Sequence, residues 1–128
     1  MGFWVFMTVM VMLFPAIMII FGKIFMSSPP KDINFAYGYR TSMSMKNKDT
    51  WIFAHKFFGK IWLIVGIVLI PFNLVPMLLC LRKAENVIGN VGYVLCVIDL
   101  LAIIIPIIFT EFALKKNFDK DGNKKQNG

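Results

Sequence analysis

Residues 61–81 read IWLIVGIVLIPFNLVPMLLCL, an uncharged run that lies between Lys60 and Arg82. At 1.5 Å of rise per helical residue, the run covers roughly 30 Å, which is the thickness of the hydrocarbon core of a bilayer. It is apolar on every side, as expected of a helix surrounded by lipid or by other helices. An unpaired strand would leave its backbone groups unsatisfied in hydrocarbon. The stretch therefore predicts a transmembrane helix.

Two further runs have the same character, residues 2–22 and residues 91–114. The second of these contains Asp99 and Glu111, yet it is too apolar for anything but a membrane span. The whole chain of 128 residues is 58% hydrophobic and only 16% charged. A soluble domain of this size could not bury so much apolar surface. We expect an all-α membrane protein, with residues 1–128 forming a single membrane domain of three transmembrane helices.

The basic residues predict which way the helices face. Seven of the 14 Lys and Arg residues fall in residues 23–60, five fall after residue 114, and two lie between the second and third spans. Basic residues are concentrated in the cytoplasmic segments of membrane proteins. We therefore expect the loop 27–60 and the solvated tail 115–128 to be cytoplasmic and the amino terminus to lie outside the cell.

The outer turn, residues 82–90, contains Gly89 and Asn90, which suit a reversal of direction between antiparallel helices. Cys80 and Cys96 lie within apolar runs, where we expect them to pack as small residues, although a disulfide between them stays open. With a single histidine and no Cys/His set at metal-ligand spacing, we expect no metal and no cofactor.

The net charge of +7 does not predict nucleic-acid binding, because the lysines stand beside apolar runs. In that position basic residues set topology and contact anionic headgroups, so we expect membrane lipid as a partner and no direct contact with nucleic acid. Glu111 precedes Lys115 by four residues, which predicts a helical ion pair near the inner surface.

The inner loop predicts a second kind of helix. Residues 27–30 read SSPP and end the first span. Ser44 or Asn47 can cap a helix that begins near Lys48. The following residues form an apolar face and a basic face, which predicts a cytoplasmic amphipathic helix at the membrane surface that runs into the second span. The apolar face consists of Trp51, Ala54, His55, Phe58 and Trp62, and the basic face of Lys48, Lys56 and Lys60.

Residues 34–59 read NFAYGYRTSMSMKNKDTWIFAHKFFG, and this stretch resembles the signature of the SdpI/YfhL family of small bacterial membrane proteins. As in that family, the signature precedes a transmembrane helix. Two positions depart from the pattern, Ser42 where proline is expected and His55 where asparagine is expected. The matching positions are Asn34, Gly38, Tyr39, Arg40, Thr41, Ser44, Lys46, Asn47, Trp51, Ala54 and Gly59.

The resemblance implies a location in the bacterial cell membrane and a function that is not catalytic. The best-known member of the family confers immunity to a secreted peptide toxin and holds its own transcriptional repressor at the membrane. By resemblance we expect an immunity or sensor protein, with a membrane-active peptide as its partner outside and a repressor as its partner inside.

Within the signature, Arg40 and His55 are the candidate site residues with the most distinctive chemistry. The Arg40 guanidinium suits a phosphate headgroup or a carboxylate, although pairing within the chain to Asp32 or Asp49 is an equally good interpretation. His55 can titrate near neutral pH, but a single histidine on an aromatic helix face more often serves packing.

Asn73 and Asp99 form a second candidate site, inside the membrane. Counted from the centres of their spans, both lie about 3–5 Å outward of the midplane, so they can form a hydrogen bond across the hairpin. An ionisable residue in hydrocarbon is costly and indicates function by default, but a purely structural clamp is the alternative. The functional interpretation is a small transporter or proton-coupled channel, which would need a homo-oligomer. An enzyme acting on lipid ranks last, because no nucleophile stands beside a base.

Overall fold

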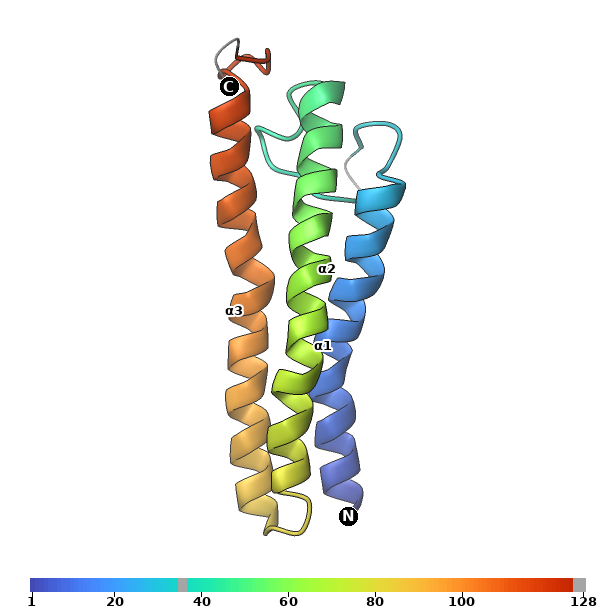
Figure 1. Cartoon of the computed structure of the whole chain (residues 1–128), viewed down its shortest axis with the longest axis vertical. Coiled ribbons are helices and arrows are strands. Elements are labelled where there is room, and N and C mark those ends of the chain that lie inside the picture. The colour runs from blue at the N-terminus through green and yellow to red at the C-terminus, as the bar shows by residue number, and fades with distance from the viewer. Residues whose placement is uncertain (35–36, 126–128) are drawn as a thin grey trace.

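The computed structural model describes residues 1–34 and 37–125 and contains three long helices, α1 (Gly2–Ser27), α2 (Lys48–Leu79) and α3 (Glu85–Asn117). They lie side by side, with α2 antiparallel to the other two (Figure 1). Each is long and apolar enough to cross a membrane. The predicted all-α architecture with three spans is confirmed, and the chain is a multi-pass membrane protein. Phe35 and Ala36 of the signature, and residues 126–128 of the tail, lie outside the described residues.

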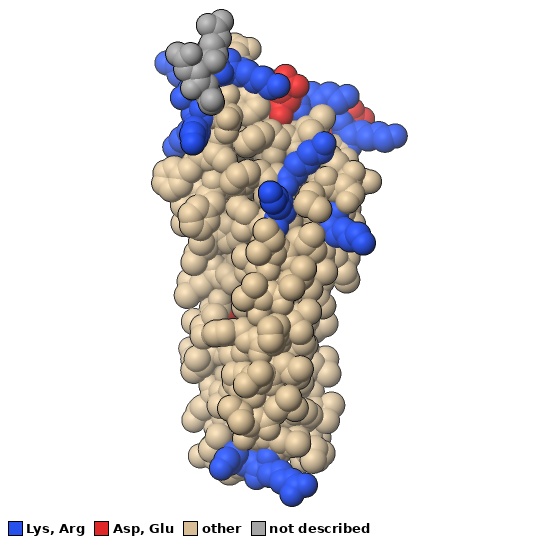
Figure 2. All heavy atoms as spheres, viewed as in Figure 1, with Lys and Arg blue, Asp and Glu red and all other residues tan. Residues whose placement is uncertain are grey.

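The two ends of the bundle differ in charge. One end, here called the basic end, carries the end of α1, the start of α2, the end of α3 and the connection 28–47. The opposite end carries the amino terminus and the short connection 80–84. Figure 2 shows Lys and Arg gathered at these two ends, most of them at the basic end, with a broad belt almost without charged side chains between them. This region is called the apolar belt, because many large hydrophobic side chains are exposed along the helices there.

The turn between α2 and α3 is shorter than predicted. The second helix ends at Leu79 and the third begins at Glu85, so Gly89 and Asn90 lie inside α3 and the prediction that they form the turn is wrong. The residue before α3 is Ala84, whose extended backbone lies in the connection where the chain reverses direction. Glu85 then stands in the first turn of α3, where an acidic side chain is stabilised by the helix dipole.

The segment for which an amphipathic helix was predicted forms roughly the first three turns of α2, continuous with the second span, and its amphipathic character stays a prediction. Its apolar face is buried inside the protein, since Trp51, Ala54 and His55 are fully buried and Phe58 is nearly so. These side chains therefore pack against the connection 28–47 and the neighbouring helices. The position of this segment at a membrane surface stays a prediction.

The α1–α2 interface is the most extensive in the bundle, and two glycines let the backbones of the two helices touch. A Cβ added to Gly59 would lie 2.6 Å from the Gly22 carbonyl oxygen, and a Cβ added to Gly22 would lie 2.7 Å from that of Gly59. Only glycine fits at either position without moving backbone atoms.

The lysines of the segment after α3 are exposed, as predicted for a solvated tail, but the segment also has a fold that the sequence did not predict. Phe118 is buried and forms an isolated antiparallel bridge with Lys124. Gly122, with a φ of 88°, accepts a hydrogen bond of 2.6 Å from the Asn47 side chain at the start of α2. Residues 118–125 therefore fold back over the basic end, because their apolar residue is covered and their turn has a polar partner.

Candidate functional site

The start of α2 is fixed by a reciprocal cap. Asn47 Oδ1 accepts the Thr50 backbone N–H at 2.9 Å, and Thr50 Oγ1 accepts the Asn47 backbone N–H at 3.1 Å. This arrangement satisfies backbone donors that the first turn of a helix leaves free. The prediction that Asn47 caps a helix starting at Lys48 is confirmed. Because Asn47 Nδ2 also donates to Gly122, one side chain holds the helix start and the folded tail together.

A tight turn precedes the cap and is built around Ser44, which is fully buried. The Thr41 backbone N–H donates to Ser44 Oγ at 2.9 Å, and the Ser44 backbone N–H donates to Thr41 Oγ1 at 3.2 Å. The Ser44 carbonyl accepts the Thr50 hydroxyl at 3.0 Å. The signature hydroxyls therefore supply the hydrogen bonds that secondary structure supplies elsewhere, and they lock the loop onto α2.

His55 holds the other end of the signature loop, here called the motif loop and defined as residues 37–47. Its Nε2 accepts the Tyr39 backbone N–H at 2.8 Å, and its Nδ1 lies 2.7 Å from the Trp51 carbonyl. A nitrogen that accepts an N–H carries no proton, so the ring is neutral with its proton on Nδ1. The interpretation of His55 as a packing residue fits this geometry, with the addition that it binds backbone.

Gly38 explains why the loop can approach His55 so closely. Its φ is 110°, and an added Cβ would lie 2.5 Å from His55 Nε2. A side chain at this position would therefore be strained and would collide with the imidazole. On the other side of the ring, the Trp51 indole lies 4.2 Å away between centroids and donates to the Pro30 carbonyl at 2.8 Å. The histidine is enclosed by the loop it holds.

Glu111 on α3 holds the motif loop, a contact that the sequence analysis did not predict. Its Oε2 accepts the Tyr39 hydroxyl at 2.6 Å and the Thr41 hydroxyl at 2.8 Å. The sequence predicts that this carboxylate pairs with Lys115. In the structure it binds the motif loop to α3 instead. Burial, reinforced by the Glu111 carboxylate, raises the pKa of the Tyr39 hydroxyl above its usual range. A signal existed in the sequence: a carboxylate near the inner end of a span has to find donors, and the nearby loop is rich in hydroxyls.

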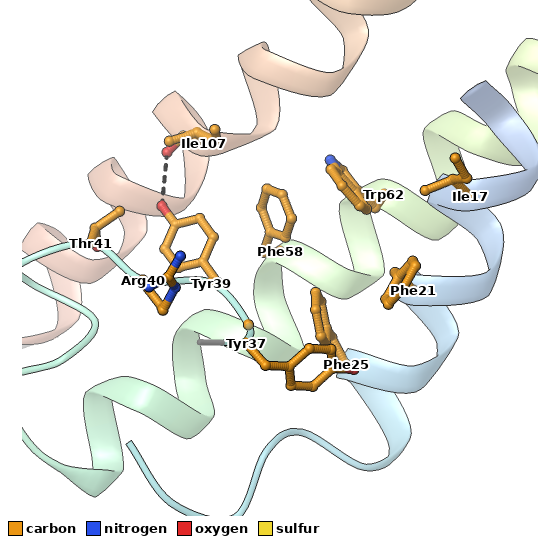
Figure 3. A pocket seen from close by; sticks show the side chains of 11 residues that line it. Ile17, Phe21, Phe25, Tyr37, Tyr39, Arg40, Thr41, Phe58, Trp62 and Ile107 are labelled. Carbon is orange, nitrogen blue, oxygen red and sulfur yellow. Dashed lines mark hydrogen bonds between the residues drawn. The ribbon is translucent and has the colours of Figure 1, made fainter. Parts of the chain in front are cut away.

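An open cavity of about 470 Å³, here called the aromatic groove, lies beside the docked loop. Figure 3 shows rings from α1 and α2 facing it, with Arg40 next to Tyr39 at the loop and Ile107 on α3. The groove is open rather than enclosed, and it reaches the side of the bundle at Ile17, which is 45% exposed in the apolar stretch of α1; most of its wall is apolar. Its lining consists of Ile17, Phe21, Phe25, Tyr37, Gly38, Tyr39, Arg40, Thr41, Phe58, Trp62 and Ile107.

Other signature residues lie away from this docked core. Asn34 closes its own local turn by accepting the Tyr37 backbone N–H at 2.7 Å. Lys46 is exposed at the basic end, and Gly59 lies at the α1–α2 contact. Arg40 is exposed, and its side chain lines the aromatic groove. The signature residues thus fall into three groups. Some bind the loop to the helices, Gly59 lets α1 and α2 approach each other, and Arg40 and Lys46 are exposed cations.

Inside the apolar belt, Asn73 connects all three helices. Its Nδ2 donates to Asp99 Oδ2 on α3 at 2.9 Å and to the Val11 carbonyl on α1 at 3.0 Å. The predicted hydrogen bond across the hairpin is therefore present. The Val11 carbonyl is available because Pro15, four residues later, has no N–H to donate to it. Asn73 Oδ1 and Asp99 Oδ1 are buried with no hydrogen-bond partner among the described residues.

Within residues 1–34 and 37–125, no group of three or more His, Cys, Asp or Glu side chains lies together in a way that could hold a metal ion. Cys80 is buried and Cys96 is half-buried, and both are free thiols in the structure. The Cys80 thiol contacts the Met77 carbonyl of its own helix at 3.4 Å.

Comparison with known proteins identifies relatives through the same region. A model of the SdpI/YfhL protein family matches residues 31–110. The chain is 36% identical over 58 residues to uncharacterized protein YfhL of Bacillus subtilis (strain 168), a match that covers 45% of this chain and 53% of the relative. The chain thus spans about half the length of the curated relative it matches. No solved structure matches it.

Proposed function

The chain belongs to the SdpI/YfhL protein family, and from this membership we propose that it is an immunity or sensor protein of the bacterial cell membrane. It protects the cell against a secreted, membrane-active peptide that reaches the bundle from outside. Its basic end is cytoplasmic, and the surface there recruits a transcriptional repressor. The family is not known as an enzyme family, and we propose no catalytic role.

The docking of the motif loop onto two helices at once is the observation that best supports this proposal. Tyr39 is bound by His55 of α2 and by Glu111 of α3. A shift of α2 against α3, such as a peptide inserted at the opposite end would cause, changes these bonds directly. The loop can then present Arg40 and Lys46 differently to a partner at the basic end. A sensor needs a two-state element of this kind that both sites can bias.

The test is a gene deletion in the native host, followed by exposure to secreted membrane-active peptides, including any encoded beside the gene. We expect the deletion strain to become more sensitive to at least one peptide, and the wild-type gene to restore resistance. A complementing gene with Glu111→Ala should restore less resistance than one with Asp121→Ala, which removes an exposed carboxylate of the tail, at equal protein level. Unchanged sensitivity to every peptide tried contradicts the proposal.

A second candidate function is a small oligomeric transporter or proton-coupled channel that uses Asn73 and Asp99. It is favoured by the two buried oxygen atoms of this pair that have no partner among the described residues. Three helices are few for a pathway, so this function needs several copies of the chain. Proton flux into liposomes should fall on Asp99→Asn, and an unchanged flux excludes this candidate.

A further inference from the structure

We propose that the aromatic groove binds one anionic phospholipid from the leaflet at the basic end. The headgroup phosphate contacts Arg40, and one acyl chain lies along the apolar wall. The argument rests on the composition of the groove, on its depth in the membrane and on its charge.

The wall of the groove is suited to an alkyl chain. Phe21 and Phe25 of α1 face Phe58 and Trp62 of α2, and Ile107 closes the wall on the α3 side (Figure 3). A cavity of about 470 Å³ lies within the range of roughly 300–1,000 Å³ that is usual for small-molecule sites. Since the groove is open at the side of the bundle, a lipid can enter it from the bilayer without leaving the leaflet.

The depth of the groove matches the lipid better than it matches a water-soluble ligand. Lys23 and Lys60 lie within the stretches of α1 and α2 that form the wall, and lysines beside a span mark the headgroup level. Ile17 stands six residues before Lys23, which places it roughly 9 Å deeper along the helix. The groove therefore runs from the headgroup level into the hydrocarbon, as a phospholipid does.

The charge of the groove selects an anionic headgroup. Arg40 is the charged residue of its lining, and a guanidinium presents its donors in a fork that matches phosphate oxygens. Among the lining residues that the structure describes, none is acidic, so the charge at the mouth of the groove is positive. The surrounding basic end adds attraction for anionic lipids.

Native mass spectrometry of the full-length protein tests the proposal. The protein is released from detergent micelles that contain equal amounts of phosphatidylglycerol and phosphatidylcholine with identical acyl chains. We expect one bound lipid per chain, with phosphatidylglycerol preferred. Arg40→Gln should weaken phosphatidylglycerol retention about tenfold, because a hydrogen bond to a charged group is lost. Arg82→Gln removes the same charge from the opposite end and is the matched control.

A second variant tests the contribution of the apolar wall separately from that of Arg40. Ile17→Trp fills the lower part of the groove and leaves Arg40 intact, so it should reduce retention of both lipids. Circular dichroism confirms that each variant keeps its helices. Equal losses in Arg40→Gln and Arg82→Gln would indicate unspecific lipid around the bundle and overturn the proposal. Retention unaffected by Arg40→Gln and Ile17→Trp would also overturn it, and would leave the groove to a peptide ligand.

Discussion

At the scale of single residues, the position of the motif loop depends on one carboxylate. Glu111 accepts two hydroxyl groups of the loop through the same oxygen, at 2.6 Å and 2.8 Å. Hydrogen bonds to a charged group contribute about 1.5–3 kcal/mol each, and a buried donor left without its acceptor is costly. The loop is thus held against α3 by two hydrogen bonds to Glu111, with a longer one from the Tyr39 hydroxyl to the Ile107 carbonyl at 3.3 Å.

Replacing Glu111 by alanine should therefore reduce the free energy of unfolding by about 1–3 kcal/mol, because Thr41 loses its acceptor and Tyr39 keeps only the longer contact of 3.3 Å with the Ile107 carbonyl. The measurement is denaturant unfolding in detergent micelles, followed by circular dichroism. Glu85→Ala removes the same side chain from an exposed site of the same helix and should cost less than about 1 kcal/mol, the usual contribution of a charge at a helix start. Equal costs for both variants would contradict the role of Glu111.

The Tyr39 hydroxyl should make the free energy of unfolding depend on pH in the alkaline range. Its folded-state pKa is raised by burial and by Glu111, so its stabilising effect is complete below the unfolded pKa of about 10 and is lost as pH rises beyond that value. The free energy of unfolding should fall between about pH 10 and pH 11 more steeply in the wild-type protein than in Tyr39→Phe. Tyr93→Phe, at a site that is 69% exposed, should keep the wild-type slope. Identical slopes in all three proteins would refute this assignment.

The sequence revealed local partners and missed distant ones. Asn47 and Thr50 are three residues apart, so the cap could be predicted from capping chemistry alone. Glu111 and Tyr39 are 72 residues apart, and the sequence offered Lys115 as a nearer partner. The Asn73–Asp99 bond was an exception, because the fixed rise of a helix and the thickness of the bilayer set both residues at one depth.

At the scale of helices, the α1–α2 interface depends on the absence of two side chains. Gly59→Ala should destabilise the protein by about 1–3 kcal/mol, because the new methyl group meets the Gly22 carbonyl oxygen and cannot be accommodated by a side-chain rotation. The measurement is the shift in thermal unfolding temperature in detergent.

Gly89→Ala is the matched control for this substitution. A Cβ at position 89 would lie 3.6 Å from the Phe3 ring, an ordinary contact. The exchange should be neutral or stabilise α3 by up to about 1 kcal/mol through helix propensity. A stabilising Gly59→Ala would show that the two helices do not touch where the structure places them.

The Asn73 side chain on α2 donates hydrogen bonds to α1 and α3, so replacing it should leave two acceptors on those helices without a donor. Asn73→Leu should cost about 1–2 kcal/mol, since Asp99 and the Val11 carbonyl lose their donor inside the apolar belt. Adding Asp99→Leu should recover part of that loss, because two apolar side chains replace a half-satisfied pair. A double-mutant cycle by denaturant unfolding measures this coupling, with exposed Asn86→Leu as a control. Simple additivity of the two substitutions would argue against it.

The existence of each helix was predictable, but its ends were not. Hydropathy marks the part of a helix that lies in hydrocarbon, whereas α1 continues to Ser27 and α3 begins at Glu85, beyond the apolar runs. Gly89 and Asn90 have the chemistry of turn residues, but they lie inside α3, where Gly89 faces the Phe3 ring of α1, a contact that the local sequence does not reveal. The folded segment 118–125 was missed for the same reason, as its partner Asn47 belongs to another helix.

At the scale of the whole molecule, the uneven charge of the two ends predicts one orientation in the membrane. Single cysteines replace Ser42 at the basic end and Asn86 at the opposite end, both exposed, in a Cys80→Ala/Cys96→Ala background. An impermeant maleimide should label position 86 in intact cells and position 42 only after lysis. Labelling of position 42 in intact cells would reverse the topology.

The long separation between Tyr39 and Glu111 also sets an order of events during synthesis. The motif loop leaves the ribosome well before Glu111. During that interval it can contact α1 and α2, but the hydrogen bonds to Glu111 cannot yet form. The same delay applies to the Asn47 amide, whose partner Gly122 is translated 75 residues later. In a nascent product that ends before Glu111, the motif loop has its contacts with α2 but lacks those with α3, and we expect proteases to cut the loop more readily until the third helix packs.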